Sequence, residues 1–279
     1  SRYGLSQVTI IFKDGTDIYW ARQLINQRLQ EAKSALPDSI DPQMSPISTG
    51  LGEIYQWVVK AEPNAKKADG SAYSAMDLRE IQDWIIRPQL QRVQGVAEVN
   101  SIGGYNKTYV VSPDLTRLQQ LQIPLTDLQD ALQNNNENRG AGFIEENGQQ
   151  LTVRVPGMLM SIQDIQNGTV ATKNGLPIRV ADVASVSIGH DLRTGGATYN
   201  GQETVLGIAM MMMGENSKTI AKAIDDKVQE IQRSLPQGVV IETVYDRSSL
   251  VNKAIKTVAK NLIEGAILVI VILFIFLGN

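Results

Sequence analysis

The stretch VLGIAMMMMGENSKTIAKAIDDKVQEIQRSLPQGVVIETV, residues 205–244, contains a complete strand–helix–strand pattern. The apolar run Val205–Met213 predicts a strand, and Gly214-Glu215-Asn216 predicts a turn in which Asn216 caps a helix. Apolar residues at steps of three and four give this helix one buried face: Ile220, Ile224, Val228, Ile231 and Leu235. Pro236 ends the helix, and Val239–Val244 predicts the next strand.

The same pattern occurs 199 positions earlier in the chain. Val8–Phe12 predicts a strand, Gly15 lies in a turn, and Asp17 is placed to cap a helix. The apolar stripe of that helix is Ile18, Ala21, Ile25, Leu29, Ala32 and Leu36. Pro37 ends it, so the distance from turn glycine to terminating proline is the same in both copies. The repeat predicts an α+β fold with duplicated strand–helix units.

The region between the two copies predicts further elements. Ile54–Ala61 is expected to be a strand, and Met76–Val93 a helix with a kink at Pro88. Val96–Ile102 and Lys107–Ser112 are expected to pair with each other around Gly103-Gly104. Residues 138–194 differ, because Asn147-Gly148 and Asn174-Gly175 each separate two strand-like runs. This part predicts a small β-rich insertion.

The chain closes on LIEGAILVIVILFIFLGN, residues 262–279, which carries no charge after Glu264. Gly265–Leu277 corresponds to about 20 Å of helix, against a bilayer core of about 30 Å. The run has no polar face, so a membrane-spanning helix present only in part is favoured over a buried core helix. Residues 246–279 are therefore expected to be an amphipathic lead-in followed by a truncated span, and the chain a segment of a larger membrane protein.

Composition excludes several classes of function. The 26 basic and 29 acidic residues form no basic block of the kind that binds nucleic acid. The chain has no cysteine and only one histidine, His190, so thiolate chemistry, a serine–histidine triad and a two-histidine zinc site are all disfavoured. No nucleophile–base pair or phosphate-binding glycine loop is evident, so we do not expect an enzyme or a tightly bound cofactor.

Two kinds of side chain are candidates for metal contact. Glu53 follows Gly-Leu-Gly and precedes an apolar strand, which places a carboxylate at the edge of a cleft; a solvated or capping carboxylate is the alternative. Met210–Met213 offers thioethers suited to Cu(I) or Ag(I), but alternation along a strand lets only two, such as Met210 and Met212, share a face. Packing in the core is the favoured role of these methionines.

Seven stretches together resemble the heavy-metal efflux branch of the resistance–nodulation–division transporters. They include DGTDIYWAR (14–22), GLGEIYQWVV (50–59), IPLTDLQDAL (123–132), the run ending in MMMMGENS (217), and TVYDRSSLVNKAI (243–255). IPLxDLxxAL is shared widely in that superfamily, whereas DGTDIYWAR and the MGENS turn are typical of the metal branch. The resemblance implies duplicated ferredoxin-like porter subdomains with a docking insertion.

The resemblance also implies a division of the chain. Residues 1–62 are similar to an incomplete first porter subdomain, 63–137 with 195–245 to the second, and 138–194 to a docking domain that reaches a neighbouring protomer. Residues 246–279 are similar to the lead-in and start of the second transmembrane helix. The family's zinc-exporting members imply that Glu53 contributes to a periplasmic metal site, with Asp83 as a weaker companion.

The family implies a function for the segment. Its members are proton-driven homotrimers of the bacterial inner membrane that pass a monovalent or divalent heavy-metal ion through a periplasmic adaptor to an outer-membrane channel. Most of this segment is then periplasmic, although three lysines before the span would by the positive-inside rule place that flank in the cytoplasm. Export of drugs or organic compounds, or membrane assembly without transport, are the alternatives.

Overall fold

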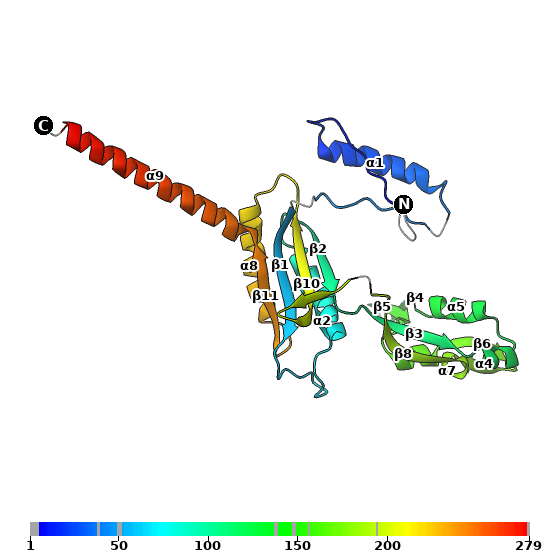
Figure 1. Cartoon of the computed structure of the whole chain (residues 1–279). Helices are drawn as coiled ribbons and strands as arrows, with labels where there is room; N and C mark the ends of the chain where they lie inside the picture. Colours follow the sequence, from blue (N-terminus) through cyan, green and yellow to red (C-terminus); the bar gives the residue numbers. More distant parts are fainter. Residues whose placement is uncertain are drawn as a thin grey trace.

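The structure is a computed structural model that describes residues 6–37, 40–48, 52–136, 139–146, 149–155, 157–193 and 195–277. In chain order its elements are α1 (Ile18–Lys33), β1 (Glu53–Ala61), α2 (Ala75–Ile81), the π-helical turn η2 (Gln82–Ile86), α3 (Arg87–Leu90), β2 (Val96–Gly103), β3 (Lys107–Pro113), α4 (Leu115–Gln120), α5 (Leu125–Asn134), β4 (Arg139–Glu146), β5 (Gln149–Val155), α6 (Ile162–Asn167), β6 (Thr169–Lys173), β7 (Leu176–Arg179), α7 (Val180–Val183), β8 (Ala184–His190), β9 (Ala197–Tyr199), β10 (Gln202–Met211), α8 (Ser217–Gln232), β11 (Val239–Asp246) and α9 (Arg247–Leu277). Figure 1 shows a central sheet, a second α/β module beside it, the helix α9, which projects away from the sheet, and the helix α1, which lies apart from both.

The central sheet is antiparallel, with strand order β11-β1-β10-β2 and the short β9 beside β10. Two strand–helix–strand crossings build it, β1–α2–α3–β2 and β10–α8–β11. This order and connection are those of a ferredoxin-like unit. The expected α+β class is therefore observed, with one complete ferredoxin-like unit in the described residues and a long insertion between its second and third strands.

The main hydrophobic core lies between this sheet and the helices α2, α3 and α8. Trp57 is fully buried there, and its ring packs so closely on Gly207 that a Cβ at that position would lie 2.2 Å from it. Five residues of α8 are buried against the sheet: Ile220, Ala221, Ile224, Val228 and Ile231. Four of them belong to the stripe predicted from the sequence, so the helical periodicity identified the buried face of α8.

The helix expected at Met76–Val93 runs from Ala75 to Leu90 and contains a π-helical turn at Gln82–Ile86. In a regular α-helix the ring of Pro88 would clash with the carbonyl four residues earlier. The π turn just before Pro88 is wider than an α-helical turn and relieves this clash. The turn directs Gln82 into the core, where its Oε1 accepts a hydrogen bond from Trp57 Nε1 at 2.9 Å. Ser101 Oγ lies 3.3 Å from Gln82 Nε2. The expected distortion at Pro88 is therefore a π turn.

The second module has its own core and is larger than the predicted insertion. Its buried residues are Leu118, Ile123, Leu128, Ile165, Val180, Val183 and Ala184. They come from both sides of residue 138, so α4 and α5 pack with the insertion and not with the central sheet. The boundary expected at 137/138 is wrong, because the module extends from β3 to β8, residues 107–190.

The expected pairing of Val96–Ile102 with Lys107–Ser112 is also wrong. β2 pairs with β10, and β3 pairs with β8. Gly103 and Gly104, with φ of 84° and 66°, form the point at which the chain leaves one sheet and enters the other module. A glycine pair signals a sharp change of direction, but it does not say which strands pair afterwards.

Both predicted hairpins are present. β6 and β7 flank Asn174 and Gly175, whose φ values of 50° and 79° are those of a type I′ turn. β4 and β5 pair around Asn147-Gly148, although those two turn residues lie outside the described residues.

The N-terminal copy of the repeat is only partly formed. α1 and α8 each have 16 residues and are related by the predicted offset of 199. The expected strand Val8–Phe12 is wrong, since these residues form no strand and the side chain of Ile11 is 91% exposed. A strand needs a hydrogen-bonded neighbour, and in the described structure none lies beside this stretch. The expected boundary at residue 62 is wrong as well, because β1 lies between β11 and β10 in the central sheet.

The C-terminal helix α9 begins directly after β11 and continues for 31 residues without a break. Among the described residues it is the one helix long and apolar enough to cross a membrane, judged by length and composition. The lead-in and the apolar run expected from the sequence are thus one continuous helix, which projects away from the sheet in Figure 1.

Candidate functional site

The face of the central sheet opposite α2 and α8 carries the strongest sequence candidate, Glu53. In the ladder, Glu53 of β1 lies opposite Met210 of β10, which lies opposite Glu98 of β2. Directly opposed residues on neighbouring strands project to the same side, so these three side chains form a row across one face. We call this face of the sheet the outer face.

The row holds two carboxylates on either side of a thioether. Strands are spaced about 4.8 Å apart, so Glu53 and Glu98 are separated by about 10 Å of backbone across Met210. Both glutamates and Met210 are partly exposed. Two glutamate side chains reaching toward each other over such a distance can share one cation at carboxylate–metal distances of about 2.0–2.2 Å.

Glu53 has one side-chain partner among the described residues, since its Oε2 accepts a hydrogen bond of 3.3 Å from Gln56 Nε2. The ladder is irregular between Glu53 and Tyr55, so that Ile54 and Tyr55 are both buried while Glu53 stays on the outer face. The bulge thereby places a carboxylate at the end of the sheet with coordination capacity to spare.

The methionine run does not behave as one strand. β10 ends at Met211, which packs against the main core, and the register shifts between Met210 and Met211. Met212 follows the strand, with its backbone N–H bonded to the carbonyl of Gly95. The strand expected to reach Met213 is therefore too long. Met210 alone of the run lies in a ladder row on the outer face, where its sulfur accepts a hydrogen bond from Asn100 at 3.6 Å.

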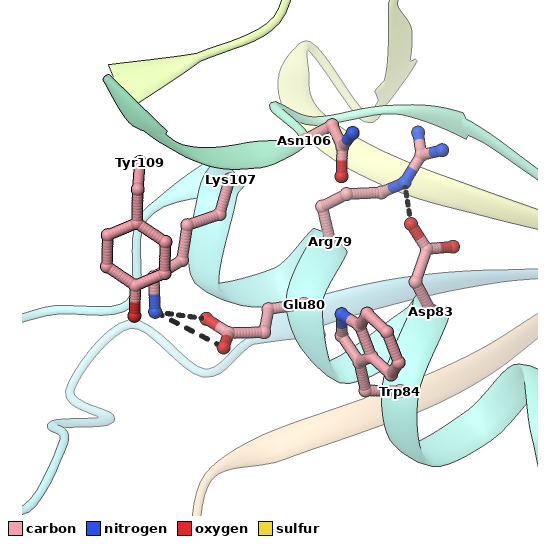
Figure 2. Close-up of a pocket in the computed structure, with 7 residues that line it drawn as sticks. All are labelled: Arg79, Glu80, Asp83, Trp84, Asn106, Lys107 and Tyr109. Atoms are coloured by element: carbon pink, nitrogen blue, oxygen red, sulfur yellow. Dashed lines mark hydrogen bonds and ion pairs between the residues drawn. The ribbon is translucent and has the colours of Figure 1, made fainter. Parts of the chain in front are cut away.

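Asp83 lies in a cleft of about 250 Å³ at the junction of the central sheet and the second module (Figure 2). Arg79 Nε donates to one of its carboxylate oxygens at 2.5 Å, and Ser101 Oγ donates to the other at 2.6 Å. Nearby, Glu80 pairs with Lys107 at 3.2 Å across the same junction. Both oxygens of Asp83 already have partners, so this carboxylate holds the π turn to α2 and β2 within the central unit.

Glu53 and Asp83 do not share a site. Asp83 contacts Ser101, which lies in the ladder row of Gly207 and Trp57, four residues along β1 from Glu53. At about 3.3 Å per residue, that is about 13 Å along the strand. Within the part of the chain that the structure describes, no group of three or more His, Asp or Glu side chains is arranged to hold a metal ion.

A second polar cluster on the outer face was not expected from the sequence. Lys60 pairs with Glu242, and Tyr199 donates a 2.6 Å hydrogen bond to the same carboxylate. The hydrogen bond from Lys60, reinforced by that from Tyr199, lowers the pKa of Glu242, while the same contact raises the pKa of Lys60. The sequence shows only that polar residues alternate with apolar ones along β1 and β11. It does not indicate that Lys60 and Glu242 pair with each other across these two strands.

The turn residues Asp17 and Asn216 have structural roles. Asp17 accepts from the backbone N–H of Trp20 at 2.8 Å, and Asn216 accepts from Lys218 and Thr219. Both therefore cap helices as predicted. His190 ends β8, and its ring lies 4.7 Å from that of Tyr105.

The whole chain matches a sequence model of known transporters, described as the AcrB/AcrD/AcrF family, over residues 1–279. The chain belongs to this family. Its relatives place it in the heavy-metal efflux branch, as the sequence motifs predicted. It is 61% identical over 279 residues to the cobalt-zinc-cadmium resistance protein CzcA of Cupriavidus metallidurans. It is 36% identical over 281 residues to the cation efflux system protein CusA of Escherichia coli.

The family's solved structures agree with the fold. A crystal structure of a heavy metal efflux pump superposes with a TM-score of 0.82 at 29% identity, covering 96% of this chain and 26% of the pump. The chain also spans 26% of the length of CzcA and of CusA, while all of it is aligned to each. The family member described here thus corresponds to about a quarter of its full-length relatives.

Proposed function

We propose that this chain is part of a proton-driven pump of the bacterial inner membrane that exports heavy-metal cations, and that the outer face of its sheet borders the path of the ion. The observation that carries this proposal is the 61% identity, over the whole chain, to a protein named for cobalt, zinc and cadmium resistance. The row of Glu53, Met210 and Glu98 supplies a surface of suitable chemistry.

The two carboxylates favour a borderline divalent ion as cargo. Carboxylate oxygens suit zinc, cobalt and similar ions, whereas a single thioether is a poor site for Cu(I) or Ag(I), which prefer several soft ligands. Glu53 and Glu98 would each contribute to transient contact, with further ligands from the rest of the full-length pump. Passing contact suits a transporter, because tightly held cargo is not released.

The second module, residues 107–190, is the part that we assign to docking. It stands beside the sheet and leaves apolar side chains exposed, among them Met160 at 78% and Leu176 at 72%. In a homotrimer such side chains would be buried on a neighbouring protomer, and the same end of the pump would meet the adaptor and the outer-membrane channel.

The proposal is tested by removing each charge in the full-length transporter. Glu53→Gln and Glu98→Gln keep the shape of the side chain, so protein level and oligomer size should not change, whereas resistance to zinc, cobalt and cadmium should fall. We expect an apparent loss of ion affinity of at least about tenfold, since even groups in the outer shell of a metal contribute about that much. The measurement is the metal concentration that stops growth of cells lacking other exporters.

Two matched variants make the result specific. Glu230→Gln removes the same charge from the exposed side of α8, where Glu230 pairs with Lys227, and should leave resistance unchanged. Met210→Leu nearly conserves volume and should also be tolerated. Loss of copper or silver resistance in Met210→Leu, with Glu53→Gln and Glu98→Gln unaffected, would reject the carboxylate path in favour of soft-metal export.

A further inference from the structure

The first half of α9 concentrates positive charge in a chain that is acidic overall. The whole sequence has formal charge −3, yet within Arg247–Leu277 four residues are basic and only Glu264 is acidic. Three of the basic residues, Lys253, Lys256 and Lys260, are exposed. Their charge is therefore displayed on the helix that leads into the apolar run.

These lysines are confined to one face. At 100° per residue they fall within an arc of about 60°. The apolar residues of the same segment, Val251, Ile255, Val258 and Leu262, fall within a similar arc whose centre is about 160° away. Ile255, Val258 and Leu262 are 55%, 58% and 68% exposed. The segment is amphipathic with both faces open, which is the pattern of a helix at a membrane interface.

The height of the lysines above the apolar run fits the headgroup layer. Measured from Leu262, Lys260 is about 3 Å and Lys253 about 14 Å away along the helix axis. A headgroup layer is about 5–7 Å thick, and charges act across a further Debye length of about 8 Å. All three lysines therefore lie within reach of phosphate charge, and their side chains can extend along the helix toward it.

Intramolecular ion pairs do not neutralise the positive charge of these lysines. Lys260 lies 3.7 Å from Glu264, one turn further along α9. For Lys253 and Lys256, the described part of the chain offers no carboxylate within ion-pair distance. Two unpaired cations and one exposed pair on a single face leave net positive charge available to an anionic partner.

We propose that Lys253, Lys256 and Lys260 form a binding surface for anionic phospholipid headgroups at the point where α9 enters the bilayer. The inference rests on the proposed placement of α9 in the membrane and adds a lipid preference to it. It also accounts for lysines on a flank that the family places in the periplasm, where the positive-inside rule disfavours them.

The test uses one fluorophore at the headgroup level. The chain has no cysteine, so Asn261→Cys introduces one labelling site into it, next to Lys260. Any cysteine in the rest of the full-length transporter is first replaced by serine. The labelled protein is reconstituted in phosphatidylcholine nanodiscs that contain either brominated phosphatidylglycerol or brominated phosphatidylcholine as quencher. We expect phosphatidylglycerol to be enriched at the label about fivefold, the effect of one fully engaged lysine, and the preference to weaken with salt.

Variants then assign the preference to these residues. The triple change Lys253→Gln, Lys256→Gln and Lys260→Gln should abolish it, and the corresponding arginine substitutions should retain it. Removing lysines from α8 by Lys218→Gln and Lys222→Gln should have no effect, since those residues lie on the sheet-bound helix.

Each outcome decides the proposal. Equal quenching by the two lipids in the unmodified protein, or a preference that survives the triple change, would overturn the lipid surface while leaving the transport proposal intact. Absence of quenching by either lipid would show that α9 is not in the bilayer, which would overturn both proposals.

Discussion

Helices α1 and α8 have the same local sequence signals but differ in how much of their apolar face is buried. Each has 16 residues, each follows a glycine at φ of 82° or 86°, and each begins at an Asp or Asn cap. Yet α8 buries five residues against the sheet, whereas α1 buries only Ala21. The segment before α8 is strand β10, while the segment before α1 forms no strand.

The difference shows what local sequence can and cannot determine. A turn glycine, a cap and a stripe of apolar residues specify where a helix begins, ends and presents its apolar face. They do not provide the surface on which that face packs. α8 has β1 and β11 beside it, and within the described residues α1 has no sheet of its own. Stability should therefore differ greatly between equivalent positions.

The largest effect is expected at the matched pair Ile224 and Ile25, which are 199 residues apart. Ile224 is fully buried, so Ile224→Ala should cost about 2–5 kcal/mol of unfolding free energy through lost burial and the cavity left behind. Ile25 is only partly buried, so Ile25→Ala should cost less than about 1 kcal/mol. Denaturant unfolding, monitored by the fluorescence of buried Trp57, measures both. Equal losses would show that α1 has a packing partner equivalent to that of α8.

A smaller effect is expected at the two caps. Asn216→Ala and Asp17→Ala each remove a hydrogen-bond acceptor for the first turn, which stabilises a helix by about 1 kcal/mol. For α8 this loss should appear in global unfolding, because the helix and the sheet unfold together. For α1 it should appear as faster amide hydrogen exchange in residues 18–21, with the global midpoint unchanged. A shift of the global midpoint by Asp17→Ala would mean that the two helices belong to one cooperative unit.

The smallest effect on stability is expected at α2, whose N-terminal capping box contains a titratable carboxylate. Asp77 completes a capping box with Ser74 and pairs with Lys67. Burial acts to raise the pKa of Asp77, but the hydrogen bonds from Ser74 and Lys67 outweigh it, so the pKa lies below the usual 3.8. A depressed folded-state pKa contributes stability above the unfolded value, and that stability is lost as pH falls through the folded value.

The pH prediction is measured as a difference between two proteins. The native chain should melt at a higher temperature than Asp77→Asn at neutral pH, and the difference should shrink as pH falls below about 4. A difference that stays constant down to pH 2 would show that the capping box does not depend on the charge of Asp77.

Much of the local structure could be predicted from the sequence. The caps at Asp17 and Asn216, the stop at Pro236 and the turn at Asn174-Gly175 are short-range signals, and each is present. The errors are long-range. β3 pairs with β8, more than 70 residues away, and nothing in Lys107–Pro113 specifies that partner. The expected domain limits failed for the same reason, because a boundary depends on which distant segments share a core.

The candidate site shows the same division. The position of Glu53 at the start of an apolar strand could be predicted from its neighbours. The row that joins it to Glu98 depends on the register of three strands, two of them with irregularities, and could not. For Asp83 the sequence indicated a carboxylate on a helix, but the π turn and the bond to Ser101 that define its role arise only from packing.

The direct connection between β11 and α9 has a mechanical consequence. β11 ends at Asp246 and α9 begins at Arg247, and Asp246 holds the first turn by accepting from the backbone and hydroxyl of Ser248. No flexible linker separates the sheet from α9, so a change in the direction of the helix acts directly on β11. A tilt of roughly 10° at Arg247 would move the far end of this helix, about 46 Å long, by about 8 Å. With α9 in the bilayer as proposed, such a tilt would be passed to β11, the strand next to β1, on which Glu53 lies.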